Sequence, residues 1–250
     1  MSKPTVGIFG LTGCAGDQLV VLNCEDRLLE LVSLLDIRDF LTASSANDET
    51  CDLDIALVEG AVLSDRDEAA LRRIRERSKV LVALGTCAVW GGVAALDRLA
   101  GDRDRLLAEV YGEGGHGFDA RPARALHEVV DVDLNITGCP VEKHEVVGAI
   151  AALLNGNPPV TLEYPVCTEC RNAENRCVLV DDRVMCLGAL TAAGCRARCP
   201  SLGVACIGCR GPVHDANVAS ALDLYREMGF STDEVESRMT LFAPLAVGQS

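Results

Sequence analysis

The chain has 250 residues, of which 49% are hydrophobic and 4% aromatic, and its formal net charge at pH 7 is −14. This length supports one large domain, or a core domain with a smaller appendix. The acidic balance excludes a nucleic-acid-binding function, because no strongly basic tract is available to neutralise phosphates. The longest apolar stretch, around residues 146–154, is too short to span a membrane.

The N-terminal sequence MSKPTVGIFG contains neither the apolar segment of a signal peptide nor a twin-arginine pair. We therefore expect a cytoplasmic protein. In a reducing compartment, 13 cysteines are more typical of metal ligands or catalytic thiols than of a disulfide framework.

The first 155 or so residues alternate apolar runs with helical patterns, which is typical of an α/β domain with a parallel sheet. Strands are predicted at residues 5–9, 53–58, 80–84 and 134–137. Helices are predicted at residues 18–35, 65–78 and 141–154, the second opened by a capping box of Ser64 and Asp67. Residues 102–120 are expected to form a surface excursion.

The run Asn-Gly-Asn-Pro-Pro at residues 155–159 is the clearest break in composition, and it predicts a domain boundary. We expect one domain at residues 1–157 and a second, irregular and cysteine-rich domain at residues 158–250. The second domain should end in a helix at residues 215–228 and a further helix capped by Ser231 and Glu234.

Three motifs of the first domain place a cysteine just after a predicted strand. They are TGCAGD (12–17), GTCAVWGG (85–92) and TGCP (137–140), which contain Cys14, Cys87 and Cys139. The carboxyl ends of parallel strands meet at one edge of a sheet, so three such thiols should converge on a shared metal site. A phosphate-binding loop is the alternative for the first motif, but it matches neither GxxxxGK[ST] nor GxGxxG.

The fourth ligand of this site is an open question, because position 17 holds Asp where a CxxC pair would place a second cysteine. A carboxylate is a harder ligand than a thiolate, and it can still complete a [4Fe–4S] cluster while shifting its potential. The alternative is that Asp17 caps the helix that follows.

The second domain contains a cysteine ladder, in which eight of the 13 cysteines fall within 43 residues. Its members are Cys167, Cys170, Cys177, Cys186, Cys195, Cys199, Cys206 and Cys209. Eight thiols are the number needed for two four-cysteine sites, and their density and x2 spacings suit iron–sulfur clusters or zinc.

Taken together, TGCAGD, GTCAVWGG, TGCP, CLGALTAAGCRARCP and CIGCRGP resemble the small, electron-transferring subunit of [NiFe]-hydrogenases, in its cytoplasmic, bidirectional or sulfhydrogenase-like branch. The resemblance implies a flavodoxin-like first domain that holds a proximal cluster through Cys14, Cys87 and Cys139. It also implies three [4Fe–4S] clusters in all. Cys167, Cys170, Cys177 and Cys186 would bind the distal cluster, and Cys195, Cys199, Cys206 and Cys209 the medial one. Cys186 and Cys195 could exchange places in this scheme.

The same resemblance implies that this chain relays electrons and has no catalytic residue of its own. The nickel–iron centre would lie in a partner large subunit, and a flavin-containing diaphorase or ferredoxin-like subunit would exchange electrons at the other end. Two alternatives remain: a cluster subunit of a heterodisulfide- or quinone-linked complex, and a structural zinc protein that acts as an interaction module.

Four residues outside these sets are also of interest. Cys24 and Cys51 are expected to be free structural thiols. Trp90 should pack near the proximal site or at a subunit interface, and Glu59 should line the partner interface.

Overall fold

The computed structural model describes residues 3–24, 26–101, 103–112 and 121–244. Its core is a five-stranded parallel sheet in the order β2-β1-β3-β4-β5. The strands are β1 (Thr5–Gly10), β2 (Asp36–Asp39), β3 (Leu53–Glu59), β4 (Ser78–Leu84) and β5 (Leu134–Ile136). This order is that of flavodoxin-like, doubly wound sheets, so the predicted α/β class is confirmed.

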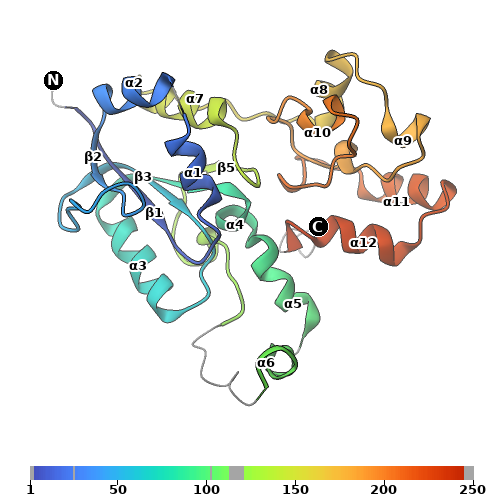
Figure 1. Cartoon of the computed structure of the whole chain (residues 1–250), viewed down its shortest axis with the longest axis horizontal. Helices are drawn as coiled ribbons and strands as arrows, with labels where there is room; N and C mark the ends of the chain where they lie inside the picture. Colours follow the sequence, from blue (N-terminus) through green and yellow to red (C-terminus); the bar gives the residue numbers. More distant parts are fainter. Residues whose placement is uncertain (1–2, 25, 102, 113–120, 245–250) are drawn as a thin grey trace.

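Helices cover both faces of the sheet, with α1 (Gly16–Leu22), α2 (Asp26–Leu34) and α7 (Lys143–Leu154) on one side and α3 (Asp65–Glu76) on the other (Figure 1). Side chains alternate between the faces along each strand. In β3, Leu57 belongs to the core under α1 and α7, whereas Val58 belongs to the core under α3. The sheet is thus buried on both sides, which explains its apolar strands.

The structure differs from the sequence-based prediction in two of these elements. The helix predicted at residues 18–35 is two helices, because α1 ends at Asn23, a poor helix former whose N–H bonds the carbonyls of Leu19 and Val21. The strand β2, with sequence DIRD, was not predicted, since an edge strand with charged side chains carries no apolar signal. The capping box of α3 is present as predicted, with Ser64 and Asp67 each bonding the other's backbone.

Short elements connect β4 to β5. They are α4 (Gly85–Trp90), a 3₁₀ turn (Gly92–Leu96), α5 (Asp97–Ala100), α6 (Arg103–Tyr111) and a second 3₁₀ turn (Leu126–Glu128). The predicted surface excursion at residues 102–120 contains α6, while residues 102 and 113–120 lie outside the described part of the chain.

The C-terminal segment forms a separate lobe beside the sheet (Figure 1), with its own apolar core around Tyr225. Its elements are α8 (Val166–Asn172), α9 (Val178–Asp181), a 3₁₀ turn (Leu187–Ala189), α10 (Arg198–Ser201), α11 (Val218–Glu227) and α12 (Thr232–Thr240). The helix α11 begins at Val218 rather than 215, because Asp215 has a left-handed φ of 57° and Asn217 is the N-cap. Ser231 caps α12 as predicted.

Within the residues that the structure describes, none of the helices combines the length and apolar character that crossing a membrane requires.

Candidate metal centres

Four strands end level with one another at the carboxyl edge of the sheet. The register aligns Gly10 with Glu59, Glu59 with Leu84, and Leu84 with Ile136. Cys14, Cys87 and Cys139 follow three of these ends after four, three and three residues respectively. The first site is therefore assembled by the topology of the sheet, as the sequence pattern predicted.

Each loop that holds one of these thiols is bent by a backbone feature. Ala15, beside Cys14, is left-handed, and the peptide before Pro140 is cis. Gly92 has φ +60°, and a Cβ atom at this position would stand 2.5 Å from the Cys87 sulfur. Glycine is required there because the turn must be left-handed and must leave room for the thiol.

The thiols and carboxyls of this site are close enough to perturb one another. Burial, followed by the charges of Cys139 and Asp17, raises the pKa of Cys87 to about 12. Burial and the charge of Asp17 likewise raise the pKa of Cys139 to about 11. Only thiolates bind metal, so the deprotonated site needs a cationic centre to offset this concentration of negative charge.

Asp17 lies inside this group rather than at a helix cap. It is only 8% exposed, and its Oδ1 accepts a hydrogen bond of 2.8 Å from the Val141 backbone N–H. The N-cap of α1 is Ala15 and no side chain bonds the cap, so Asp17 is not the cap residue, although it lies in the first turn, where its charge favours the helix dipole. Burial raises the pKa of Asp17 to about 7, with Glu59 adding to the effect and the Val141 bond opposing it.

A second group of thiols surrounds a small cavity in the C-terminal lobe. The cavity has a volume of about 40 Å³, and its walls include Cys167, Cys170, Cys177 and Cys186. Burial raises the pKa of Cys167 to about 11, and the charges of the other three add to the shift. Gly188 lies against this cavity, where a Cβ atom would stand 3.4 Å from the Cys167 sulfur and 3.6 Å from that of Cys186. The four cysteines of the predicted distal set thus share one hollow.

The remaining four cysteines lie between these two groups. Partial burial raises the pKa of Cys209, and the charge of Cys199 adds to it; burial raises the pKa of Cys206, and the charges of Cys186 and then Cys209 add to it. Cys195 lies in a loop that Glu169 holds, because the carboxylate accepts from the N–H of Gly194 at 2.9 Å and of Ala197 at 3.1 Å.

Sequence reasoning missed three residues that hold these groups together. The Thr86 hydroxyl donates to the Cys209 carbonyl, and Glu169 bonds the loop around Cys195. Arg210 is 4% exposed and forms a two-pronged ion pair with Glu145 of α7, at 2.8 and 2.7 Å. Their positions inside or beside cysteine motifs were the only signal in the sequence.

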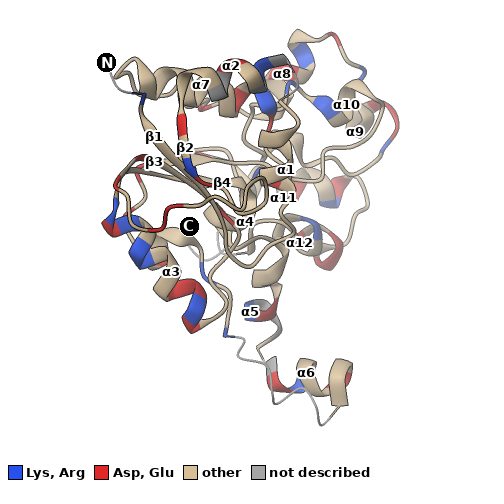
Figure 2. Cartoon of the chain, turned by 60° about the vertical axis from the view of Figure 1, so that its left-hand side comes forward, with Lys and Arg blue, Asp and Glu red and all other residues tan. Residues whose placement is uncertain are grey.

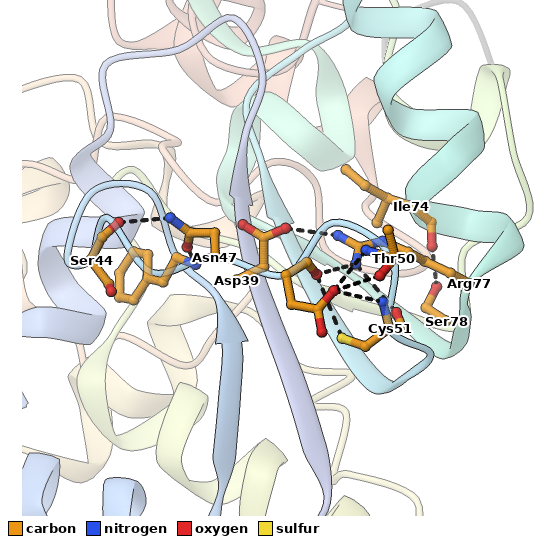
Figure 3. A network of polar contacts seen from close by, with 10 residues as sticks. Asp39, Ser44, Asn47, Thr50, Cys51, Ile74, Arg77 and Ser78 are labelled. Carbon is orange, nitrogen blue, oxygen red and sulfur yellow. Dashed lines mark hydrogen bonds and ion pairs between the residues drawn. The ribbon is translucent and has the colours of Figure 1, made fainter.

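Two cysteines lie outside all three groups. Cys24 is buried in the core under α1 and α7, and its thiol donates to the Val20 carbonyl. Cys51 lies in a polar network with Asp39, Thr50 and Arg77 near β2 (Figure 3), and burial raises its pKa. These surroundings fit free structural thiols.

Trp90 and Glu59 also occupy informative positions. Trp90 packs on Gly211, so the end of α4 contacts the segment after Cys209, and the indole Nε1 is buried without a hydrogen-bond partner. Glu59 is 3% exposed and accepts a 2.8 Å bond from the Gln18 N–H, which makes it part of the strand-end site rather than of an outer surface.

Sets of four thiols fit polynuclear clusters, in which each thiolate binds a different iron atom. Ligands of one metal ion stand much closer together. Within the described part of the chain, no three His, Cys, Asp or Glu side chains are close enough to hold a single ion.

Known proteins resemble this chain along most of its length. The family model for the NADH ubiquinone oxidoreductase 20 kDa subunit matches residues 14–153, more than half of the chain. The sulfhydrogenase 2 delta subunit of Pyrococcus furiosus is 39% identical over 95% of this chain and 98% of its own length. A subunit of the F420-non-reducing vhu hydrogenase of Methanocaldococcus jannaschii is 32% identical over 94% of this chain and 92% of its own.

Solved structures agree with these relatives. An NAD+-reducing [NiFe]-hydrogenase in the H2-reduced state matches with a TM-score of 0.55 and 28% identity, over 64% of this chain and 95% of its own. The actinobacterial-type NiFe-hydrogenase from Ralstonia eutropha H16 shares the fold, with a TM-score of 0.62 and 16% identity over 96% of this chain and 89% of its own. The chain belongs to the NADH ubiquinone oxidoreductase 20 kDa subunit family and, within it, to the small, electron-transferring subunits of [NiFe]-hydrogenases.

Proposed function

We propose that this chain carries electrons through three [4Fe–4S] clusters between a nickel–iron centre in a partner large subunit and a flavin- or ferredoxin-type subunit. The observation that supports it most strongly is the gathering of the cysteines into three groups, in the order strand-end site, Cys206–Cys209 loop and distal cavity. Iron–sulfur clusters supply one-electron redox chemistry at potentials set by ligands, hydrogen bonds and burial.

In this proposal the proximal cluster is held by Cys14, Asp17, Cys87 and Cys139. The medial cluster is held by Cys195, Cys199, Cys206 and Cys209, and the distal cluster by Cys167, Cys170, Cys177 and Cys186. The shared hollow of the last four supports keeping Cys186 in the distal set. The location of Asp17 among the proximal thiols supports its role as a ligand.

The chain's own residues would tune and isolate each cluster. The backbone N–H of Cys206 donates to the Cys186 sulfur at 3.2 Å, which stabilises the electron-rich thiolate. Burial of Cys87, Cys206 and Cys209 excludes water from the clusters. We also propose the domains 1–157 and 158–250, because the two cores beside the sheet draw their residues from before this boundary and the core of the C-terminal lobe from after it.

The exposed thiols indicate where partners would bind. Cys14 and Cys139 are exposed, and they mark the face for the large subunit. Cys177, a member of the distal set, is also exposed. The lobe that contains Cys177 exposes aliphatic and basic side chains, with Lys and Arg segments visible near α8 and α10 (Figure 2). The exposed aliphatic and basic side chains of this surface are Arg171, Arg176, Val180, Arg183, Val184, Arg196, Leu202 and Val204.

This surface is unusual for the chain as a whole. In a protein of net charge −14 it exposes Arg171, Arg183 and Arg196, while Arg176 is paired with Asp181 and Asp182. Complementary charge speeds association, so the second partner should present an acidic face, as a ferredoxin-type domain can. A cytoplasmic location belongs to the same proposal and is supported by the thiol usage.

The experiment is to purify the chain anaerobically together with whatever it binds. Mass spectrometry, nickel and iron analysis and EPR should then find a nickel-containing large subunit and iron–sulfur signals. A colourless, zinc-loaded chain without a nickel partner would support the structural zinc alternative instead.

A variant then tests the direction of the relay. Cys206→Ser should disturb the medial cluster and stop H2-dependent reduction of an external acceptor. Isotope exchange between H2 and water at the partner's metal should remain, because that reaction needs no electron transfer along the chain. Loss of exchange at normal subunit levels would contradict the assignment.

A further inference from the structure

A single buried hydroxyl connects the proximal and medial ligand segments. The Thr86 side chain is 1% exposed and lies next to Cys87 in the chain. Its Oγ1 accepts a hydrogen bond of 3.1 Å from the Gly138 N–H and donates one of 2.5 Å to the Cys209 carbonyl. One atom therefore joins the neighbours of two proximal ligands to a medial ligand that lies 123 residues away in the sequence.

The same junction brings two ligands into direct contact. Cys209 is half-buried, and this partial burial raises the pKa of its thiol, while the nearby Cys139 backbone N–H acts against that rise. The charge of Cys209 in turn raises the pKa of Cys139, after the larger effects of burial and Asp17. A proximal ligand thus donates its N–H toward a medial ligand.

The contact depends on how the two lobes are held. The residue before Cys139 is fixed to the start of α4 by the bond from the Thr86 N–H to the Gly138 carbonyl, at 2.9 Å. Cys209 belongs to the C-terminal lobe, and the Thr86 hydroxyl joins its carbonyl to the start of α4. Arg210, the residue after Cys209, adds a second tie through its ion pair with Glu145 of α7, and this pair does not involve Thr86.

We propose that Thr86 is a positioning residue for electron transfer between the proximal and medial sites; this inference rests on the proposed function. The Thr86 hydroxyl forms a hydrogen-bonded bridge from the Gly138 N–H, beside Cys139, to the Cys209 carbonyl. Electron tunnelling weakens steeply with separation and passes better through bonded atoms than through gaps. One electron leaves the reduced proximal site and reduces the oxidised medial site. No bond is made or broken and no proton is transferred.

The medial–distal junction provides an internal control, because it is bridged without Thr86. There the Cys206 N–H donates to the Cys186 sulfur at 3.2 Å. A change at Thr86 should therefore slow the first transfer and leave the second unaffected.

The test uses the purified hydrogenase complex with Thr86→Val, which keeps the shape of the side chain and removes the hydroxyl. Thr86→Ser is the rescue variant. Thr5→Val is the matched control, since the Thr5 hydroxyl also donates to a backbone carbonyl (Asp52, 3.0 Å) and accepts from a backbone N–H (Asp54, 3.0 Å). Thr5 lies at the opposite end of β1 from the clusters.

The first measurements are iron and sulfide content, cluster potentials by EPR-monitored titration, and H2 isotope exchange, all expected at wild-type levels in Thr86→Val. Rapid-freeze EPR after a pulse of H2 should then show the medial signal appearing several-fold later. The distal signal should follow the medial one with the wild-type delay. Thr86→Ser and Thr5→Val should match the wild type.

Intact clusters with a wild-type transfer rate in Thr86→Val would overturn the inference, as would equal slowing in Thr5→Val. If Thr86→Val does not assemble, the inference is tested by measuring amide hydrogen exchange in the wild-type complex. Strong protection of the Gly138 and Cys139 amides supports the bridge, and rapid exchange overturns it. A wild-type complex without three clusters would instead refute the proposed function, before any variant is compared.

Discussion

Replacing Gly92 by Ala should remove the proximal cluster from an otherwise folded chain. The added Cβ would stand 2.5 Å from the Cys87 sulfur, whereas ordinary contact begins at 3.4 Å, so the two atoms must separate by about 0.9 Å. Metal–ligand distances tolerate changes of only about 0.2 Å. Cys87 therefore cannot satisfy both the methyl group and an iron atom.

The left-handed backbone adds a cost that has nothing to do with the thiol. A non-glycine residue with positive φ loses about 1–2 kcal/mol. Gly101→Ala measures this cost by itself, since Gly101 has φ +73° and nothing lies within 4 Å of its Cβ position. If Gly92→Ala loses iron that Gly101→Ala keeps, the loss is caused by the contact with Cys87 and not by backbone strain.

The assay is iron and sulfide content, with EPR of the reduced complex, for both variants beside the wild type. Gly92→Ala should lack the proximal signal and contain about four iron atoms fewer per chain, the content of one [4Fe–4S] cluster. Gly101→Ala should retain all signals. A full proximal cluster in Gly92→Ala would refute the assignment of Cys87 as a ligand.

Three further predictions concern Asp17, Tyr225 and Glu145. Asp17→Cys should keep the proximal cluster and shift its reduction potential in EPR-monitored titration, because a thiolate replaces a harder ligand. Tyr225→Phe should lower the free energy of unfolding in urea by about 1–2 kcal/mol, since it leaves the buried Cys186 carbonyl, now bonded at 2.8 Å, without a partner. Glu145→Ala should lower it by about 3 kcal/mol, because the buried Arg210 loses its counter-charge.

Each of these predictions has a control and a contradicting result. An unchanged potential in Asp17→Cys would mean that Asp17 does not bind the cluster. Tyr164→Phe, at a residue 38% exposed, should change stability by less than about 0.5 kcal/mol. Glu109→Ala breaks an exposed pair with Arg105 and should change stability by a similarly small amount. If these two control variants lost as much stability as Tyr225→Phe and Glu145→Ala, the argument from burial would be contradicted.

The strand-end site could be predicted from the sequence because topology alone assembles it. Cys14, Cys87 and Cys139 each follow an apolar run, and a parallel sheet brings the ends of such runs together. The ladder could likewise be found from its spacing. The residue types and their spacing along the chain are enough to predict both features. Neither prediction requires knowledge of contacts between distant residues.

Other features depend on contacts between distant parts of the chain. The roles of Thr86 and Arg210 come from partners 123 and 65 residues away, which spacing cannot reveal. The strand β2 was missed because its pairing with β1, rather than its own charged sequence, makes it a strand. Asp17 remained open for the same reason, since only the fold brings Val141 to its carboxylate.

The central claim is that this chain holds three four-iron clusters. Metal analysis of the anaerobically purified complex, corrected for iron in its partners, tests it most directly when combined with EPR-monitored redox titration. We expect about 12 iron and 12 sulfide atoms per chain and three separable cluster signals. Iron for only one or two clusters, or zinc in place of iron in the cysteine ladder, would contradict the claim.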